Sequence, residues 1–337
     1  MSPTACGAFI AGCQGPVLQA DEQRFFSETR PFGFILFARN IDTPDQIRAL
    51  CNDLRISAGY DAPIWIDQEG GRVARLRPPL WRDWLPPLDQ VRAAGPRAAE
   101  VMRLRYRIIA AELRALGIDG NCAPCADIAR PDTHEILYNR CYGTEPGPVA
   151  EIARAVSDGL IAGGVLPVLK HIPGHGAANL DSHLELPHVA LPRAVLEAQD
   201  FAPFAALSDL PFAMTAHIVY DAIDATAPAT TSAPMIRLIR EQIGFQGVLM
   251  SDDISMQALS GSIADRSAAA MAAGCDLVLH CNGDLAEMQA VAANAGKVSE
   301  KAARAAVAAL ALRDTPAEDA EMLSKDWAAL MADLAND

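Results

Sequence analysis

VLPVLKH, residues 165–171, is a short run of apolar side chains that ends in a lysine and a histidine. It shows no alternation of apolar and polar residues, which is typical of a strand buried on both faces of a parallel sheet. The segment IPGH, residues 172–175, follows directly, and its proline and glycine indicate a loop. The sequence therefore predicts a buried parallel strand with polar side chains at its carboxyl end.

Seven more apolar runs are similar to this one, and helix signals lie between many of them. Thr43 followed by Pro44 is typical of a helix start, and Gly117, Gly244 and Gly274 stand where helices commonly end. Eight strands that alternate with helices over about 280 residues favour a closed (β/α)8 barrel over an open doubly wound sheet. The phosphate-binding motifs GxGxxG and GxxxxGK(S/T), typical of open sheets, do not occur. The expected strands are 7–13, 33–38, 63–67, 117–123, 165–171, 212–217, 247–251 and 276–280.

The predicted organisation is a single α/β domain, a TIM-like barrel over residues 1–297, with a helical extension over residues 298–337. No linker or low-complexity block separates the strand runs. The last segment is rich in alanine and charged residues, which is typical of helices packed on the outside of a barrel.

The charge balance excludes several classes of partner. The 337 residues include 28 Lys and Arg against 42 Asp and Glu, so the net charge is −14. Such a surface repels phosphate backbones and anionic lipids, and we expect neither nucleic-acid nor membrane partners. Segment 1–23 lacks the basic region of a secretory signal, so we expect a cytoplasmic protein, acting as a monomer. The eight scattered cysteines, including the CxxC of Cys122 and Cys125, are expected to be free and mostly buried.

Polar side chains recur at the carboxyl ends of the predicted strands, where the catalytic groups of a barrel lie. The motif DQEGGR, residues 67–72, follows the third run, and KHIPGHG, residues 170–176, begins at the end of the fifth. His217 ends the sixth run, and SDD, residues 251–253, ends the seventh. One such strand end is common, but four of them indicate a single polar pocket at the mouth of the barrel.

Three chemistries could use this pocket. Metal-assisted hydrolysis would use its histidines, but His171 and His175 flank Pro-Gly instead of one helical face, and no HxH or HExxH occurs. Phosphate binding at residues 174–176 lacks the usual supporting motifs. Glycoside hydrolysis needs a carboxylate on one face of the sugar and a proton donor on the other. The sequence offers both groups, and we expect neither a metal nor an organic cofactor.

The residues alone leave the carboxylate open between Asp252 and Asp253. The proton donor would be His183, which stands two residues after Asp181. In an extended loop these two side chains would point to the same side, so Asp181 would fix the tautomer of His183. The other ring nitrogen would then exchange protons with the leaving group, because a histidine titrates near pH ~6.5.

Four long motifs stand in order along the chain: IDQEGGRV at 66–73, KHIPGHG at 170–176, DSH at 181–183 and SDDISM at 251–256. Together they resemble glycoside hydrolase family 3, and within it the cytoplasmic β-N-acetylglucosaminidases (β-hexosaminidases) of peptidoglycan recycling. The resemblance extends to about Asn282. The short chain is similar to the single-domain Gram-negative form, which is a barrel without an extra C-terminal domain.

The resemblance implies a role for each matching residue. Asp252 matches the nucleophile, His183 the general acid/base and Asp181 its orienting partner, on a loop after the fifth strand. The sugar-binding positions that it implies are Asp67, Arg75, Arg140, Lys170 and His171.

Some of these assignments have structural alternatives. Arg140 lies beside Cys141, where the family usually has Ser or Ala, and it could instead be half of a structural ion pair. Glu69 and Arg72 are interpreted as a mainly structural pair beneath the pocket. His217 is interpreted either as pocket wall or as a residue behind it.

The implied reaction is retaining hydrolysis of terminal GlcNAc linked β-1,4 to anhydro-N-acetylmuramic acid, with or without a stem peptide. Asp252 would attack the anomeric carbon while His183 protonates the leaving oxygen. A phosphorylase on the same site stays open, because a histidine does not repel phosphate as a carboxylate would. A non-catalytic sugar-binding barrel is the more distant alternative, since mere binding has no use for the pair of Asp181 and His183.

Overall fold

All eight apolar runs predicted as strands form strands of one closed parallel barrel, in the computed structural model that describes residues 3–182, 184–316 and 318–335. Neighbours around the barrel follow the order β1-β12-β11-β9-β7-β6-β3-β2, and every pair is parallel. The predicted (β/α)8 barrel is therefore confirmed. Its strands are β1 (Gly7–Ala11), β2 (Pro31–Leu36), β3 (Ile64–Ile66), β6 (Gly120–Asn121), β7 (Leu166–Ile172), β9 (Phe212–Thr215), β11 (Val248–Asp253) and β12 (Leu277–His280).

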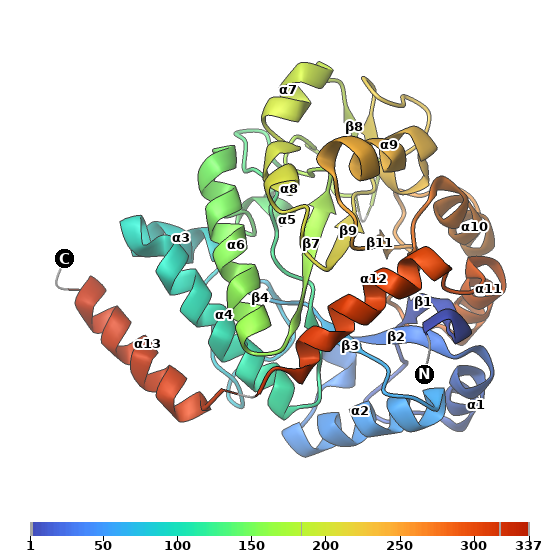
Figure 1. Cartoon of the computed structure of the whole chain (residues 1–337), viewed down its shortest axis with the longest axis horizontal. Coiled ribbons are helices and arrows are strands. Elements are labelled where there is room, and N and C mark those ends of the chain that lie inside the picture. The colour runs from blue at the N-terminus through green and yellow to red at the C-terminus, as the bar shows by residue number, and fades with distance from the viewer. Residues whose placement is uncertain (1–2, 183, 317, 336–337) are drawn as a thin grey trace.

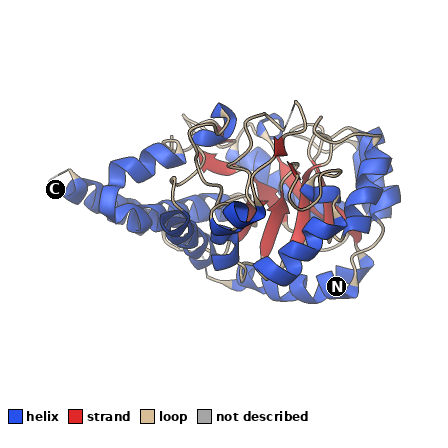
Figure 2. Ribbon diagram, turned by 90° about the horizontal axis from the view of Figure 1, so that it is seen from above, coloured by secondary structure: helices blue, strands red, loops and turns tan. Residues whose placement is uncertain are grey.

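Helices form the outer layer around these strands (Figures 1 and 2). The helix start predicted at Thr43 is confirmed, because its hydroxyl accepts a hydrogen bond from the backbone N–H of Gln46 at 3.2 Å. The predicted ends at Gly244 and Gly274 are also confirmed, since both glycines have the left-handed backbone of a helix terminus. The helices are α1 (Ala20–Thr29), α2 (Pro44–Ala58), α3 (Pro87–Ala94), α4 (Ala98–Ala115), α5 (Glu135–Tyr138), α6 (Pro146–Ala162), α7 (Arg193–Ala198), α8 (Ala202–Ala206), α9 (Ala233–Leu238), α10 (Ile263–Ala273), α11 (Leu285–Ala295), α12 (Glu300–Leu310) and α13 (Ala320–Leu334).

The interior of the barrel is packed around Trp65 of β3. Its ring lies 6.1 Å from that of Phe32 and 5.3 Å from that of Phe212, which comes from a strand that is not a neighbour of β3. Glycines make room for the indole, because a Cβ atom at Gly33 or Gly120 would come within 2.5 Å of it. The barrel is thus filled by side chains, and a ligand has room only at its ends.

Two small sheets brace the loops at the carboxyl end of the barrel. The strands β4 (Gln68–Gly70) and β5 (Val73–Ala74) pair antiparallel directly after β3. The strands β8 (His188–Val189) and β10 (Val219–Tyr220) pair in parallel, so they join the loop after β7 to the loop after β9. The long loop after β7 is therefore tied to the barrel at both of its ends.

The C-terminal helices lie outside the barrel, and α13 runs beside α4 (Figure 1). Trp327 of α13 packs edge-to-face on Trp84 with 5.1 Å between ring centroids. The boundary drawn between residues 297 and 298 stays a prediction. Within the described part of the chain, no helix is both long and apolar enough to cross a membrane.

Candidate active site

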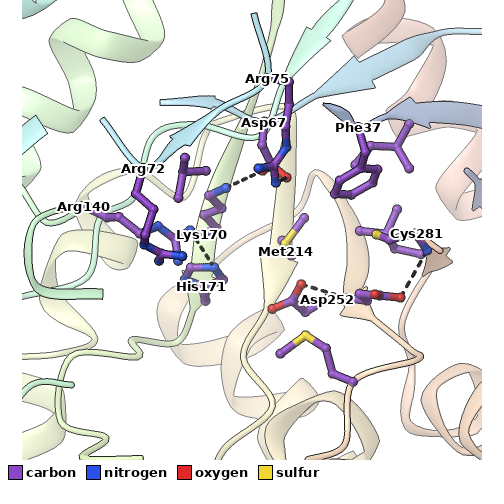
Figure 3. Close-up of a pocket in the computed structure, with 15 residues that line it drawn as sticks. Phe37, Asp67, Arg72, Arg75, Arg140, Lys170, His171, Met214, Asp252 and Cys281 are labelled. Carbon is purple, nitrogen blue, oxygen red and sulfur yellow. Dashed lines mark hydrogen bonds and ion pairs between the residues drawn. The ribbon is translucent and has the colours of Figure 1, made fainter. Parts of the chain in front are cut away.

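A cavity of about 210 Å³ opens at the carboxyl end of the barrel. It is lined by polar side chains from the loops after β3 and β6 and from the ends of β7 and β11 (Figure 3). Among the predicted site residues, those that line it are Asp67, Arg75, Arg140, Lys170, His171 and Asp252. The barrel therefore brings together residues that are up to about 185 positions apart in the sequence.

Asp67 lies at the centre of the polar side of the cavity. Its Oδ1 is 2.9 Å from Lys170 Nζ and its Oδ2 is 3.0 Å from Arg75 Nη2. Burial alone would raise the pKa of Asp67, but the two cations hold that pKa well below its ordinary value. Asp67 is therefore a carboxylate at neutral pH, and it is fixed in position to accept hydrogen bonds from a polar ligand.

Lys170 is only 2% exposed and bridges two carboxylates. Its Nζ also lies 2.7 Å from Glu69 Oε1, and Glu69 in turn forms a bidentate pair with Arg140, at 2.8 and 2.9 Å. Burial would raise the pKa of Glu69, but Arg140 and Lys170 lower it to about 2. The expected pairing of Glu69 with Arg72 is wrong. Glu69 forms its ion pairs with Arg140 and Lys170 instead, and Arg72 donates a hydrogen bond to the carbonyl of Ile136 at 2.6 Å.

Arg140 forms the structural ion pair that the sequence left open as one of its roles. It is half of the ion pair with Glu69, and it also lines the cavity. Its Nη2 lies 3.5 Å from His171 Nε2, so it borders the imidazole that faces the cavity from β7.

His171 is oriented from behind by Asp127, a residue that sequence reasoning missed. The Nδ1 atom of His171 lies 2.7 Å from Asp127 Oδ2, and Asp127 is completely buried. Asp127 reaches this place because residues 122–127 run along β7, with the backbone N–H of Ala126 donating to the carbonyl of Lys170 at 2.8 Å. The available signal was a single acidic residue within the apolar segment CAPCADIA, since a buried charge needs partners.

The structure distinguishes the two adjacent carboxylates at the end of β11. Asp253 accepts hydrogen bonds from Ser255 Oγ at 2.7 Å, from the Ser255 backbone at 3.1 Å and from the Cys281 backbone at 3.2 Å. Asp252 accepts the backbone N–H of Asp253 on Oδ1 at 2.8 Å and points into the cavity across from Asp67 (Figure 3). Both residues line the cavity, but the carboxylate of Asp253 is held by the loop, whereas that of Asp252 points into the cavity.

The wall beside Asp252 is apolar. It consists of Phe37, Met214, Met256, Leu279 and Cys281 together with smaller side chains. The guanidinium of Arg75 lies 5.0 Å from the ring centroid of Phe37, which joins the apolar wall to the polar side. A cavity with one polar and one apolar side suits a sugar ring, which carries hydroxyls on its rim and C–H groups on its faces.

The loop after β7 carries Asp181, which is not among the described residues that line the cavity. Its negative charge nevertheless acts on Arg72, which lines the cavity. Burial lowers the pKa of Arg72, and Asp181 is one of the carboxylates that oppose this change, so Asp181 lies near the cavity. The carbonyl of Asp181 accepts the backbone N–H groups of Leu184 at 2.9 Å and Glu185 at 3.0 Å. The geometry expected between Asp181 and His183 stays a prediction. His183 lies outside the described residues.

His175 connects the start of this loop to Ser182. Its Nε2 lies 3.1 Å from Ser182 Oγ, and both side chains are buried. Burial, reinforced by His171, lowers the pKa of His175 to about 4, so it is neutral near pH 7. The loop is thus held by an uncharged contact one residue from Asp181.

Two other candidates have structural roles. His217 lies behind the cavity, with Nδ1 at 2.7 Å from Thr230 Oγ1 and Nε2 at 3.0 Å from the carbonyl of Asp253. Cys125, Asp127 and His171 form a buried group with metal-ligand chemistry within the described part of the chain. Its atoms already bond to one another, at 3.3 Å from Cys125 Sγ to Asp127 and 2.7 Å from His171, and the Arg140 guanidinium adjoins it, which disfavours a cation.

Comparisons with known proteins identify the family of the chain. A profile of the Glycosyl hydrolase family 3 N terminal domain matches residues 17–311. The chain belongs to glycoside hydrolase family 3. A family relative from Methylococcus capsulatus, named a beta-hexosaminidase, is 37% identical over 321 residues, which are 93% of this chain and 94% of the relative.

Solved structures of family members match the whole fold. NagZ from Neisseria gonorrhoeae, in complex with N-trifluoroacetyl-D-glucosamine, superposes with a TM-score of 0.84 at 29% identity and covers 98% of both chains. A family 3 beta-N-acetylglucosaminidase from Paenibacillus sp. gives a TM-score of 0.81 at 31% identity, over 91% of this chain and 61% of that longer one. The protein is accordingly a glycoside hydrolase of the β-hexosaminidase class.

Proposed function

We propose that the protein is a retaining exo-β-N-acetylglucosaminidase of peptidoglycan recycling. Its substrate would be GlcNAc linked β-1,4 to anhydro-N-acetylmuramic acid, with or without a stem peptide. The observation that carries this proposal is the carboxylate of Asp252, held at the end of β11 and facing the polar side of the cavity (Figure 3). A rigid carboxylate in that place suits attack on the anomeric carbon of a sugar bound by Asp67 and its partners.

The sugar would be held by the polar side of the cavity. Asp67 accepts hydrogen bonds from hydroxyl groups, and Lys170 and Arg75 keep it charged and fixed. Arg140 and His171 border the same space and offer one guanidinium and one imidazole nitrogen. This set orients the ring so that its anomeric carbon faces Asp252.

The reaction then has two displacements. Asp252 attacks the anomeric carbon while His183 donates a proton to the departing oxygen, which gives a covalent glycosyl-enzyme and the free aglycone. His183, now neutral, takes a proton from water, and the hydroxide displaces Asp252 to release GlcNAc with its configuration retained. Asp181 orients His183 during both steps. The support for these two roles is the motif of residues 181–183 and the place of the loop beside the cavity.

Water is favoured over phosphate as the second nucleophile. The cations that line the cavity are already ion-paired: Lys170 with Asp67 and Glu69, Arg75 with Asp67, and Arg140 with Glu69. A phosphate dianion would meet these carboxylates as well as the cations, and its attraction would be weakened accordingly.

A reducing compartment is supported by the cysteines. All eight are free thiols and all are buried. Proteins of oxidising compartments more often carry disulfides, so these thiols favour the cytoplasm.

The test is a product analysis. The protein is incubated with 4-nitrophenyl β-GlcNAc and with the GlcNAc-anhydro-N-acetylmuramic acid disaccharide, each with and without phosphate, and 4-nitrophenyl β-glucoside serves as the control. We expect free GlcNAc, first as the β-anomer, in both buffers. GlcNAc 1-phosphate as the main product would make the protein a phosphorylase, and GlcNAc binding without turnover would make it a sugar-binding barrel.

A further inference from the structure

Asp127 is a buried carboxylate that no proposed catalytic step uses, yet it touches two parts of the site. Its Oδ2 accepts from His171 Nδ1 at 2.7 Å, and its Oδ1 accepts from the backbone N–H of His175 at 2.6 Å. The backbone N–H of His171 and the thiol of Cys125 approach it at 3.3 Å. A carboxylate that is 0% exposed and accepts this set of donors is a fixed point in the structure.

The first effect of Asp127 is on the tautomer of His171. Burial would raise the pKa of Asp127, but His171 and the His175 backbone hold it well below its ordinary value, so Asp127 is ionised and can only accept. His171 therefore carries a proton on Nδ1, directed at Asp127, and this bond fixes the orientation of the ring. The Nε2 atom lies at the edge of the cavity, 3.5 Å from Arg140 Nη2.

The second effect is on the start of the loop after β7. Asp127 binds the backbone at both ends of the turn from His171 to His175, which is closed by a 2.8 Å bond from the Gly174 N–H to the His171 carbonyl. The backbone here is packed without spare room, since a Cβ at Gly176 would come 1.9 Å from the carbonyl oxygen of Ile128. The turn therefore cannot shift without moving the segment that carries Asp127.

The contact between His175 and Ser182 extends this restraint along the loop. With 3.1 Å between His175 Nε2 and Ser182 Oγ, the turn is connected to the residue next to Asp181. One carboxylate thus lies beneath both a sugar-binding imidazole and the loop of the acid/base motif.

We propose that Asp127 is a positioning residue for hydrolysis: it fixes His171 for the bound sugar and sets the place of the acid/base loop through His175 and Ser182. The proposal rests on the proposed function, because both groups that it positions take their roles from that reaction. Removal of the carboxylate that orients a metal-bound histidine typically changes activity by roughly 10- to 100-fold, and we expect an effect of the same order for the carboxylate that orients His171.

The experiment compares Asp127→Asn with Asp119→Asn. Asp119 is also largely buried and also binds an arginine and a backbone N–H, but it lies at the opposite end of the barrel. Activity is expressed per active site, counted with a 5-fluoro-GlcNAc trapping reagent, so that a misfolded fraction does not enter. We expect kcat/KM on 4-nitrophenyl β-GlcNAc to fall roughly 10- to 100-fold for Asp127→Asn and less than about twofold for Asp119→Asn. Equal losses in the two variants would overturn the proposal.

Two further measurements separate positioning from a general structural role. In a His171→Ala background, Asp127→Asn should lower kcat/KM by a smaller factor than it does in the wild type, because part of its effect acts through His171. Ser182→Ala should slow the disaccharide more than the nitrophenyl glycoside, since nitrophenol departs without protonation and a sugar alcohol does not. The proposal would be contradicted if Asp127→Asn lowered kcat/KM by the same factor with and without His171, and if Ser182→Ala also slowed both substrates equally.

The outcomes also keep the two proposals apart. If the wild type hydrolyses no GlcNAc glycoside, the proposed function fails whatever the variants do. The affinity for GlcNAc, measured by calorimetry, then tests the positioning of His171 alone, and Asp127→Asn must bind GlcNAc more weakly than Asp119→Asn does.

Discussion

The two ends of the barrel use the same chemical groups in different ways. At the amino end, Asp119 precedes β6 and accepts the backbone N–H of Ile64 at 2.9 Å together with Arg55 at 2.7 Å. On the other side of the barrel, Asp276 precedes β12 and accepts the backbone N–H of Leu249 at 2.9 Å, paired with an arginine. Each carboxylate thereby joins two neighbouring strands.

At the carboxyl end, Asp67 follows β3 and Asp252 lies at the end of β11, and both carboxylates line a cavity. Asp67 is paired with Lys170 and Arg75, as Asp119 is paired with Arg55 and Arg313, and the partners of Asp67 also line the cavity at the mouth of the barrel. A buried ion pair at a strand end is therefore not informative by itself. The two ends differ in what their carboxylates bind: Asp67 and Asp252 line the cavity at the mouth of the barrel, whereas Asp119 and Asp276 each accept the backbone N–H of a neighbouring strand. A second cavity does border Asp119 at the amino end, so a cavity beside a charged group does not by itself mark the functional end.

The largest difference between the ends should be in catalysis. Asp252→Asn is expected to lower kcat on 4-nitrophenyl β-GlcNAc by roughly 10³-fold or more, because it removes the nucleophile. Asp276→Asn makes the same chemical change at the amino end and should leave kcat within about twofold, with only a loss of stability. Stopped assays on the two purified variants, together with their circular dichroism spectra, check this. Comparable kcat values for the two variants would remove the functional distinction between the ends.

Lys170→Met should affect both stability and binding. It leaves Asp67 and Glu69 buried beside each other without their shared cation, and we expect the free energy of unfolding to fall by about 3–5 kcal/mol. Arg240→Met breaks the pair with Asp276 at the amino end and should also destabilise the protein. Urea unfolding and GlcNAc calorimetry separate the two variants, because only Lys170→Met should also weaken GlcNAc binding. An unchanged GlcNAc affinity would show that Lys170 is purely structural.

The acid sensitivity of the fold should come partly from His175 at the carboxyl end. Burial first, then His171, lowers the pKa of this residue from 6.5 to about 4, so between these values the unfolded chain binds a proton that the folded one does not. Its contribution therefore makes the free energy of unfolding fall as the pH drops from about 6.5 to about 4, by up to about 3 kcal/mol. Urea unfolding at several pH values should show a shallower decline for His175→Gln. Equal slopes for the two proteins would contradict the buried, neutral state of His175.

The smallest effect should be that of Asp119→Asn. This change weakens hydrogen bonds from Ile64 and Arg55, and we expect a loss of about 1–3 kcal/mol in the free energy of unfolding. The kcat/KM value should stay within about twofold of the wild type, as measured on the nitrophenyl glycoside. A large kinetic loss here would mean that the amino end also takes part in the reaction.

The sequence predicted the barrel well because its strands are buried on both faces and read as uninterrupted apolar runs. It also predicted which side chains would meet, since Asp67, Lys170 and Asp252 all lie at or just after the carboxyl ends of strands that end at the same face. The position of Asp127 could not be predicted, because β6 has only two residues and the following segment runs along β7 by tertiary contact. The pairing of Glu69 with Arg140 could not be predicted for the same reason. Arg140 lies 71 residues away in the chain, and only the closed barrel brings the two side chains together.

The backbone bonds of Asp181 are another feature that the sequence did not predict. The Asp181 carbonyl accepts the backbone N–H groups of Leu184 and Glu185, which the spacing of the motif does not indicate. Local sequence does not determine which of these backbone bonds form, because the loop is also held by His175 and by the pairing of β8 with β10.

The most direct test of the account is covalent trapping of the glycosyl-enzyme. The protein is reacted with a 5-fluoro-GlcNAc donor bearing a good leaving group, digested, and mapped by mass spectrometry. The account predicts a single labelled peptide that contains SDD, residues 251–253, with the sugar on Asp252 and with no label in Asp252→Asn. A label on Asp253 or on any other residue would contradict it.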